Sequence, residues 1–126
     1  MALRPQGILL FVLACLVLSA PPAAAHAYLV EADPGPNDRV EDSPVEIRME
    51  FAERLEPRYC RVNVTDAQGV EYVSGPLRFS RDEPNVMFVP LATLPPGAYT
   101  VRWSTLSLDA HGAGGFYVFN VAQDAP

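Results

Sequence analysis

Apolar and polar residues alternate one by one in many short stretches of the chain. The clearest stretch is residues 45–51, VEIRMEF. The alternation places four apolar residues on one face of this stretch: Val45, Ile47, Met49 and Phe51. This pattern is typical of a β-strand with one buried face, because successive side chains of a strand point to opposite sides. No long segment keeps the 3.6-residue period of a helix.

Clusters of Pro, Gly, Asn and Asp separate the alternating stretches and predict turns. Seven antiparallel strands are expected, within residues 26–32, 45–51, 58–64, 70–73, 85–91, 98–108 and 115–121. Residues 66–69 are predicted to form a hairpin turn. The spacing predicts an all-β fold, an immunoglobulin-like Greek-key sandwich or small barrel, with enough core to fold without a metal. That core is expected to include Val45, Ile47, Phe51, Val62, Val64, Val101, Trp103 and Phe119.

The first 25 residues have the features of a cleaved secretory signal peptide. Arg4 gives a positive start, residues 8–18 are apolar, and residues 23–25 form an A-x-A cleavage site. Cleavage after Ala25 predicts a mature domain of residues 26–126, located in the periplasm or outside the cell.

Two alternatives for this segment are weaker. An uncleaved membrane anchor needs roughly 20 apolar residues, whereas this run breaks at Pro21. A lipoprotein signal would end at Cys15, but Leu13 fits that signal poorly and apolar residues continue past the cysteine.

The composition of the mature chain narrows the choice of partners. Removing the signal leaves eight arginines, no lysine and 15 acidic residues, a net charge of about −7. This balance argues against nucleic-acid binding and against a polybasic membrane patch. Cys60 is then the single cysteine, so no internal disulfide is expected. Its alternation with Val62 and Val64 predicts that it faces the core.

Both histidines fall in places that suit a metal ion. His26 would be the mature N-terminus and would offer two nitrogens, since an α-amino group with a pKa of about 7.7–8.0 can lose its proton to a strongly bound cation. Residues i and i+2 of an extended segment project from one face, so Asp109 and His111 can converge on the same ion. Three nitrogens and one carboxylate oxygen favour Cu(II), whereas zinc usually prefers a tetrahedral site.

At these residues the sequence resembles the CopC family of copper-resistance proteins, along essentially the whole mature chain. The resemblance rests on three stretches: residues 26–40 (HAYLVEADPGPNDRV), 44–57 (PVEIRMEFAERLEP) and 94–121 (LPPGAYTVRWSTLSLDAHGAGGFYVFNV). Family members commonly read S-x-D-G-H-P around the ligand pair, whereas residues 107–112 read SLDAHG. The ligands are therefore intact, although the turn differs.

The resemblance implies one Cu(II) ion per chain, held by His26, Asp109 and His111. It also places Glu53 beside the metal as a second-shell or weak ligand, although a solvated carboxylate at a strand end explains Glu53 equally well. Some members carry a methionine-rich Cu(I) segment. Here only Met49 and Met87 remain after processing, so no such site is expected.

These features predict a secreted Cu(II)-binding protein, not an enzyme, that buffers or carries copper in resistance or homeostasis. The resemblance implies an inner-membrane copper transporter of the CopD type as the partner. One alternative is an oxidative polysaccharide-cleaving enzyme with a histidine-brace copper site, although Asp109 would fill the position that oxygen needs. The other is an immunoglobulin-like interaction module without metal.

Overall fold

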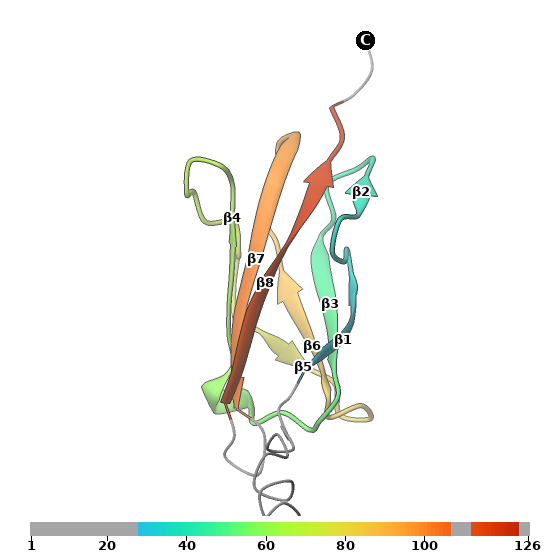
Figure 1. Cartoon of the computed structure of the whole chain (residues 1–126), viewed down its shortest axis with the longest axis vertical. Coiled ribbons are helices and arrows are strands. Elements are labelled where there is room, and N and C mark those ends of the chain that lie inside the picture. Colours follow the sequence, from blue (N-terminus) through green and yellow to red (C-terminus); the bar gives the residue numbers. More distant parts are fainter. Residues whose placement is uncertain (1–27, 107–111, 124–126) are drawn as a thin grey trace, which may run out of the picture.

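Two four-stranded β-sheets pack face to face in the computed structural model (Figure 1). The structure describes residues 28–106 and 112–123. The strands are β1 (Leu29–Asp33), β2 (Arg39–Val40), β3 (Glu46–Phe51), β4 (Arg61–Thr65), β5 (Arg78–Phe79), β6 (Val86–Pro90), β7 (Gly97–Leu106) and β8 (Gly112–Val121). One sheet has the order β1-β3-β6-β5 and the other β2-β8-β7-β4. The predicted all-β sandwich is confirmed.

The strands differ from the expected set in several respects. A 3-10 turn, Pro57–Tyr59, stands where the strand of residues 58–64 was expected to begin. The two-residue strands β2 and β5 are additional, and β2 runs parallel to β8. Residues 70–73 form no strand of their own and contribute only the isolated bridges of Glu71 and Val73. The predicted turn at residues 66–69 is present, with the Gly69 amide donating to the Asp66 carbonyl at 3.1 Å. A run of two or three residues is too short for an alternation pattern to reveal.

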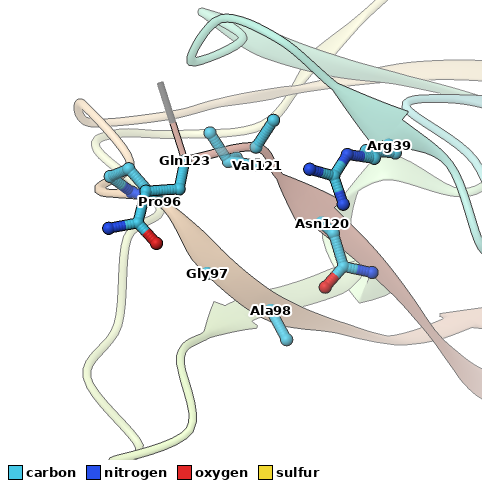
Figure 2. A pocket seen from close by; sticks show the side chains of 8 residues that line it. Arg39, Pro96, Gly97, Ala98, Asn120, Val121 and Gln123 are labelled. Carbon is cyan, nitrogen blue, oxygen red and sulfur yellow. The ribbon is translucent and has the colours of Figure 1, made fainter. Parts of the chain in front are cut away.

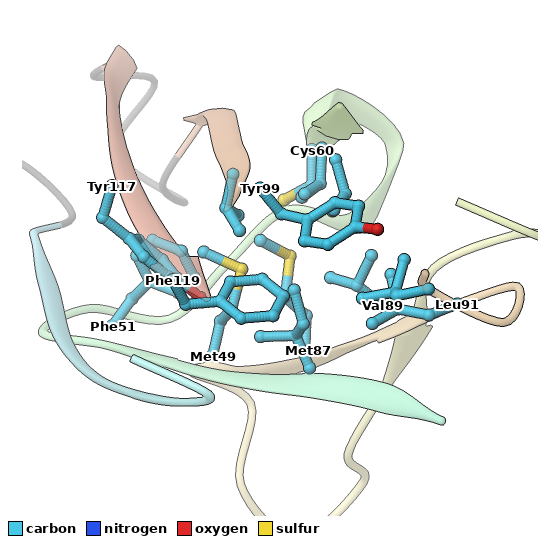
Figure 3. Close-up of a cluster of buried hydrophobic side chains, with 14 of the residues drawn as sticks. Met49, Phe51, Cys60, Met87, Val89, Leu91, Tyr99, Tyr117 and Phe119 are labelled. Carbon is cyan, nitrogen blue, oxygen red and sulfur yellow. The ribbon is translucent and has the colours of Figure 1, made fainter. Parts of the chain in front are cut away.

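The core lies between the two sheets, where side chains from β3 and β6 meet those from β7 and β8 (Figure 3). Its largest fully buried side chains are Tyr99, Phe51, Phe119, Ile47, Met49 and Met87. The prediction that Val45 belongs to this core is wrong, because its side chain is 81% exposed. β3 begins only at Glu46, so the alternation of the strand does not extend to Val45.

Trp103 and Cys60 both face inward as expected, although Trp103 is only partly buried. The Trp103 ring packs edge-on against Phe51, with 6.4 Å between the ring centroids. Its indole also covers Gly115 on β8, where an added Cβ would lie 2.7 Å from Trp103 Cζ2. Glycine at that position therefore lets the largest aromatic ring pack flat against the neighbouring strand. No helix in the described parts of the chain is long and apolar enough to cross a membrane.

Candidate metal centre

Three of the four residues expected at the metal, His26, Asp109 and His111, lie outside the described residues. Their neighbours in the chain are described. His26 comes two residues before Tyr28, and Asp109 and His111 lie on the connection between Leu106 of β7 and Gly112 of β8. Backbone hydrogen bonds at these neighbours therefore report where the ligand-bearing segments enter and leave the sandwich.

Residues 52–56, which follow β3, form backbone hydrogen bonds with the chain at both Tyr28 and Leu106. The Ala52 amide donates to the Tyr28 carbonyl at 2.8 Å, and the Glu56 amide donates to the Leu106 carbonyl at 3.0 Å. Leu106 in turn pairs with Gly112 across β7 and β8. One five-residue segment thus joins the start of β1 to the β7–β8 connection. We call this part of the molecule, at the bottom of Figure 1, the ligand end.

The 52–56 segment is itself fixed to the core. Leu55 is 3% exposed, and its amide donates to the Pro84 carbonyl at 3.0 Å. The Asn85 side chain donates to the Phe51 carbonyl at 2.9 Å, which secures the end of β3 just before the segment. Because Leu55 is an apolar residue between Arg54 and Glu56, an isolated buried position could have been suspected from the sequence. The backbone bonds to Tyr28 and Leu106 could not.

Glu53 lies in the middle of this segment and is half-buried. Within the described residues its carboxylate makes no hydrogen bond or ion pair, whereas Glu50 and Glu83 are both paired with Arg48. The role of Glu53 as a second-shell or weak ligand stays a prediction.

Cys60 also belongs to the ligand end, but its state does not suit metal binding. Its thiol donates to the Glu56 carbonyl at 3.4 Å. Burial raises the pKa of the Cys60 thiol above its ordinary value, and nearby Glu56 adds to this effect. A thiol must lose its proton to become a metal ligand. Cys60 therefore acts as a buried small side chain that supports residue 56.

The described residues do not make a metal site by themselves. Among residues 28–106 and 112–123, no three His, Cys, Asp or Glu side chains gather closely enough to hold an ion. Met49 and Met87 are fully buried in the core, so neither offers an accessible sulfur. The only two histidines in the chain, His26 and His111, both lie outside the described residues.

A hollow of about 480 Å³ lies at the opposite end, which we call the far end (Figure 2). It is formed where β7 begins and β8 ends, by Arg39, Pro96, Gly97, Ala98, Asn120, Val121, Ala122 and Gln123. Its polar side chains are one guanidinium and two carboxamides, and it contains no residue that commonly binds copper. This hollow and the 52–56 segment of the ligand end therefore lie at opposite ends of the sandwich.

Comparisons with known proteins agree on one family. A family model described as the CopC domain matches residues 29–122. Protein YobA of Escherichia coli is 33% identical over 105 residues, which cover 82% of this chain and 85% of that protein. The copper transport protein CutJ of Bacillus subtilis is 28% identical over 100 residues, covering 79% of this chain but 18% of that longer protein.

Solved structures extend the comparison to the fold. The crystal structure of CopC from Methylosinus trichosporium OB3b matches with a TM-score of 0.73 and 29% identity, covering 80% of this chain and all of that one. The copper resistance protein PcoC from Escherichia coli, described as methionine-rich, matches with a TM-score of 0.66 and 28% identity over 77% of this chain. Both structures therefore resemble this chain in sequence as well as in fold.

Proposed function

The chain belongs to the CopC family, and from this membership we propose that it binds one Cu(II) ion at the ligand end and buffers or carries copper. The family gives the chain a copper-related function, since relatives are named for copper transport and copper resistance. In the proposal, His26 supplies its amine and imidazole, His111 a second imidazole, and Asp109 a carboxylate oxygen. Glu53, which belongs to the 52–56 segment of the ligand end, would act as a second-shell or weak ligand.

The observation that carries the proposal is the 52–56 segment. It bonds to Tyr28, two residues after His26, and also to Leu106, three residues before Asp109. Segments about 80 residues apart in sequence are thereby fastened to the same short stretch. A chelate built from an N-terminal histidine and a loop Asp-x-His pair requires that arrangement.

The donor set explains the choice of ion and the role as cargo. Nitrogen ligands with one oxygen suit Cu(II), which also has the highest affinity of the divalent first-row metals for such sites. The buried Met49 and Met87 leave no soft sulfur for Cu(I) in the described residues. The protein would therefore hold copper in its oxidised form, as expected in an oxidising compartment.

The location and partner follow from the same proposal. Removal of residues 1–25 would deliver the domain of residues 26–126 to the periplasm or the outside of the cell. There it would supply or receive copper, with an inner-membrane transporter of the CopD type as the receiving protein. The enzyme alternative is disfavoured because Asp109 would occupy the copper position that oxygen activation needs open.

The N-terminal amine provides the sharpest test. A form that begins at His26 is compared with one that begins Met-His26, in which the nitrogen of His26 is an amide without a basic lone pair. We expect the added methionine to lower Cu(II) affinity by orders of magnitude, measured by calorimetric titration against a competing chelator. Both forms keep every side chain, so the comparison isolates the amine.

Two results would count against the proposal. Equal affinities in the two forms would show that the amine is not a ligand. A form beginning at His26 that gives no stoichiometric d–d absorption band on copper titration would remove the Cu(II) function altogether. Peroxide consumption on chitin or cellulose by the copper-loaded protein would instead favour the oxidative enzyme.

A further inference from the structure

β8 is paired along its whole length on one side only. All ten of its residues have a partner residue on β7. On the other side, β2 pairs only with Asn120 and Val121 (Figure 1). The Asn37 amide extends this cover by one bond, donating to the Val118 carbonyl at 2.8 Å. From Gly112 to Phe116 the strand is therefore a sheet edge without a neighbour in the described part of the chain.

The alternation of an antiparallel ladder identifies the backbone groups at this edge. The amides of Asn120 and Ala122 both donate away from β7, to the carbonyls of Asp38 and Val40, each at 2.8 Å. Residues two apart point the same way, so Phe116, Gly114 and Gly112 also direct their N–H and C=O groups outward. No described residue is bonded to the backbone of Gly114 or Phe116 on that side.

The other sheet edges are protected. β1 carries Glu31 and Asp33 and has a register irregularity after Leu29. β4 is covered by the 71–72 segment, whose Tyr72 amide donates to the Val64 carbonyl at 2.8 Å. β5 is only two residues long. Charges, bulges, covering loops and short strands are the usual means by which proteins prevent pairing at an edge.

β8 uses none of these means at its open part. Its sequence, GAGGFYVFNV, contains no charged residue and no proline, although 19% of the chain is charged. Phe116 is 63% exposed, and the Arg102 guanidinium lies over its ring, 5.4 Å from the centroid. A long, uncharged edge with free backbone groups and an exposed aromatic side chain favours pairing with another strand.

We propose that this edge pairs with the β8 edge of a second copy of the chain, antiparallel and centred on Gly114. The net charge of −6 opposes contact between two copies in general, but this strand brings no like charges together. In this register Phe116 lies opposite Gly112 of the partner subunit, and an aromatic ring covering a glycine across strands stabilises such a pair. The two β2-β8-β7-β4 sheets would become one continuous sheet. The proposal does not depend on copper binding.

Sedimentation velocity tests the pairing. The purified protein, expressed as the full chain and stripped of metal, is examined over a concentration series in high salt, which screens the net charge. We expect a reversible monomer–dimer equilibrium, weak because a single strand pair buries less area than a stable interface needs. A protein that stays monomeric up to millimolar concentration would overturn the proposal.

Phe116→Glu and Val30→Glu separate the edge from the net charge. Both replace an exposed apolar residue on an edge strand by glutamate, since Val30 is 64% exposed on β1. At position 116 the new carboxylate lies near Arg102, which favours retention of the fold. We expect Phe116→Glu to raise the dimer dissociation constant at least tenfold and Val30→Glu to leave it almost unchanged. Equal effects of the two substitutions, or none from Phe116→Glu, would place the contact elsewhere or attribute it to charge.

Amide hydrogen exchange gives a readout that needs no substitution. The N–H groups of Gly114 and Phe116 face outward, whereas those of Ala113 and Gly115 face β7. Raising the protein concentration should slow exchange at residues 114 and 116 and leave residues 113 and 115 unchanged. Protection that is independent of concentration at all four positions would contradict pairing between copies.

Discussion

The loop of residues 66–70 at the far end of the sandwich is held by hydrogen bonds between near neighbours in sequence, whereas the 52–56 segment at the ligand end bonds to distant segments. At the far end the Asp66 carboxylate accepts the amides of Gln68 and Val70, both at 2.9 Å, and the Tyr72 hydroxyl at 3.1 Å. At the ligand end residues 52–56 bond to Tyr28 and Leu106.

The difference indicates which end can carry a chelate from separate parts of the chain. A turn held by its own side chains needs no other segment, so it forms independently of the rest of the fold. The ligand end exists only when β1, β3 and β7 are all in place. We expect substitutions at the ligand end to change copper binding and substitutions at the far end to change only stability.

The largest expected effect is on copper affinity at the ligand end. His111→Ala removes one imidazole from a site with few donors, so we expect affinity to fall by more than the 10–100-fold that is usual for outer-shell partners. Apparent affinity is measured by titration against a competing chelator. The metal-free protein should unfold at the same temperature as the wild type, because position 111 lies on the connection between β7 and β8 and not in either strand. Unchanged affinity would exclude His111 from the site.

Two further substitutions at the same end provide a graded series. Asp109→Ala should weaken binding less than His111→Ala, because a carboxylate is a poorer partner for Cu(II) than nitrogen. Glu53→Gln should have a smaller effect again, and Glu41→Gln, on an exposed residue outside the ligand end, should have none. A Glu53→Gln effect as large as that of His111→Ala would make Glu53 a direct ligand.

The next effect tests packing between the ends. Gly115→Ala places a Cβ 2.7 Å from Trp103 Cζ2, so the indole must move against Phe51 and Tyr117. Overpacking of this kind should lower the free energy of unfolding by about 1–3 kcal/mol. Urea unfolding followed by Trp103 fluorescence measures it. Gly112→Ala on the same strand is the control, since its Cβ would meet nothing closer than 3.7 Å. Equal losses would show that the indole contact is not the cause.

The smallest effect is expected at the far end, from Asp66→Asn. The hydrogen bond from the Val70 amide, with others from Tyr72, Gln68 and Gly69, lowers the pKa of the Asp66 carboxyl in the folded protein. The stabilisation by its charge is therefore fully present above the unfolded pKa of about 3.9 and is lost as pH falls through the lower folded value.

The difference in unfolding free energy between wild type and Asp66→Asn should accordingly shrink on acidification, with the wild type more stable at neutral pH. Thermal unfolding between pH 2 and pH 7 measures this difference. Copper affinity at neutral pH should be the same in both proteins. A pH-independent difference would assign the role of Asp66 to shape and not to charge, and altered copper affinity would remove the separation between the ends.

The sequence by itself determined the longer strands and most of the core. Alternation at Ile47, Met49 and Phe51 fixes which side chains face inward, because the period of a strand is set by the backbone alone. It failed at Val45, where the strand had not yet begun. The turn at residues 66–69 was also predictable, since its hydrogen bonds join residues four or fewer positions apart.

Only the tertiary structure decided what meets at the ligand end and which edge stays open. Local propensity contains no information on whether the amide of Glu56 will find the carbonyl of Leu106, 50 residues later. The open edge of β8 likewise depends on β2 beginning only at Arg39, because in a parallel pair the residues before Arg39 would lie beside the earlier part of β8. A two-residue parallel strand leaves no pattern in the sequence. Contacts between distant segments form because the buried faces of both sheets must pack together, and that requirement acts on the whole chain at once.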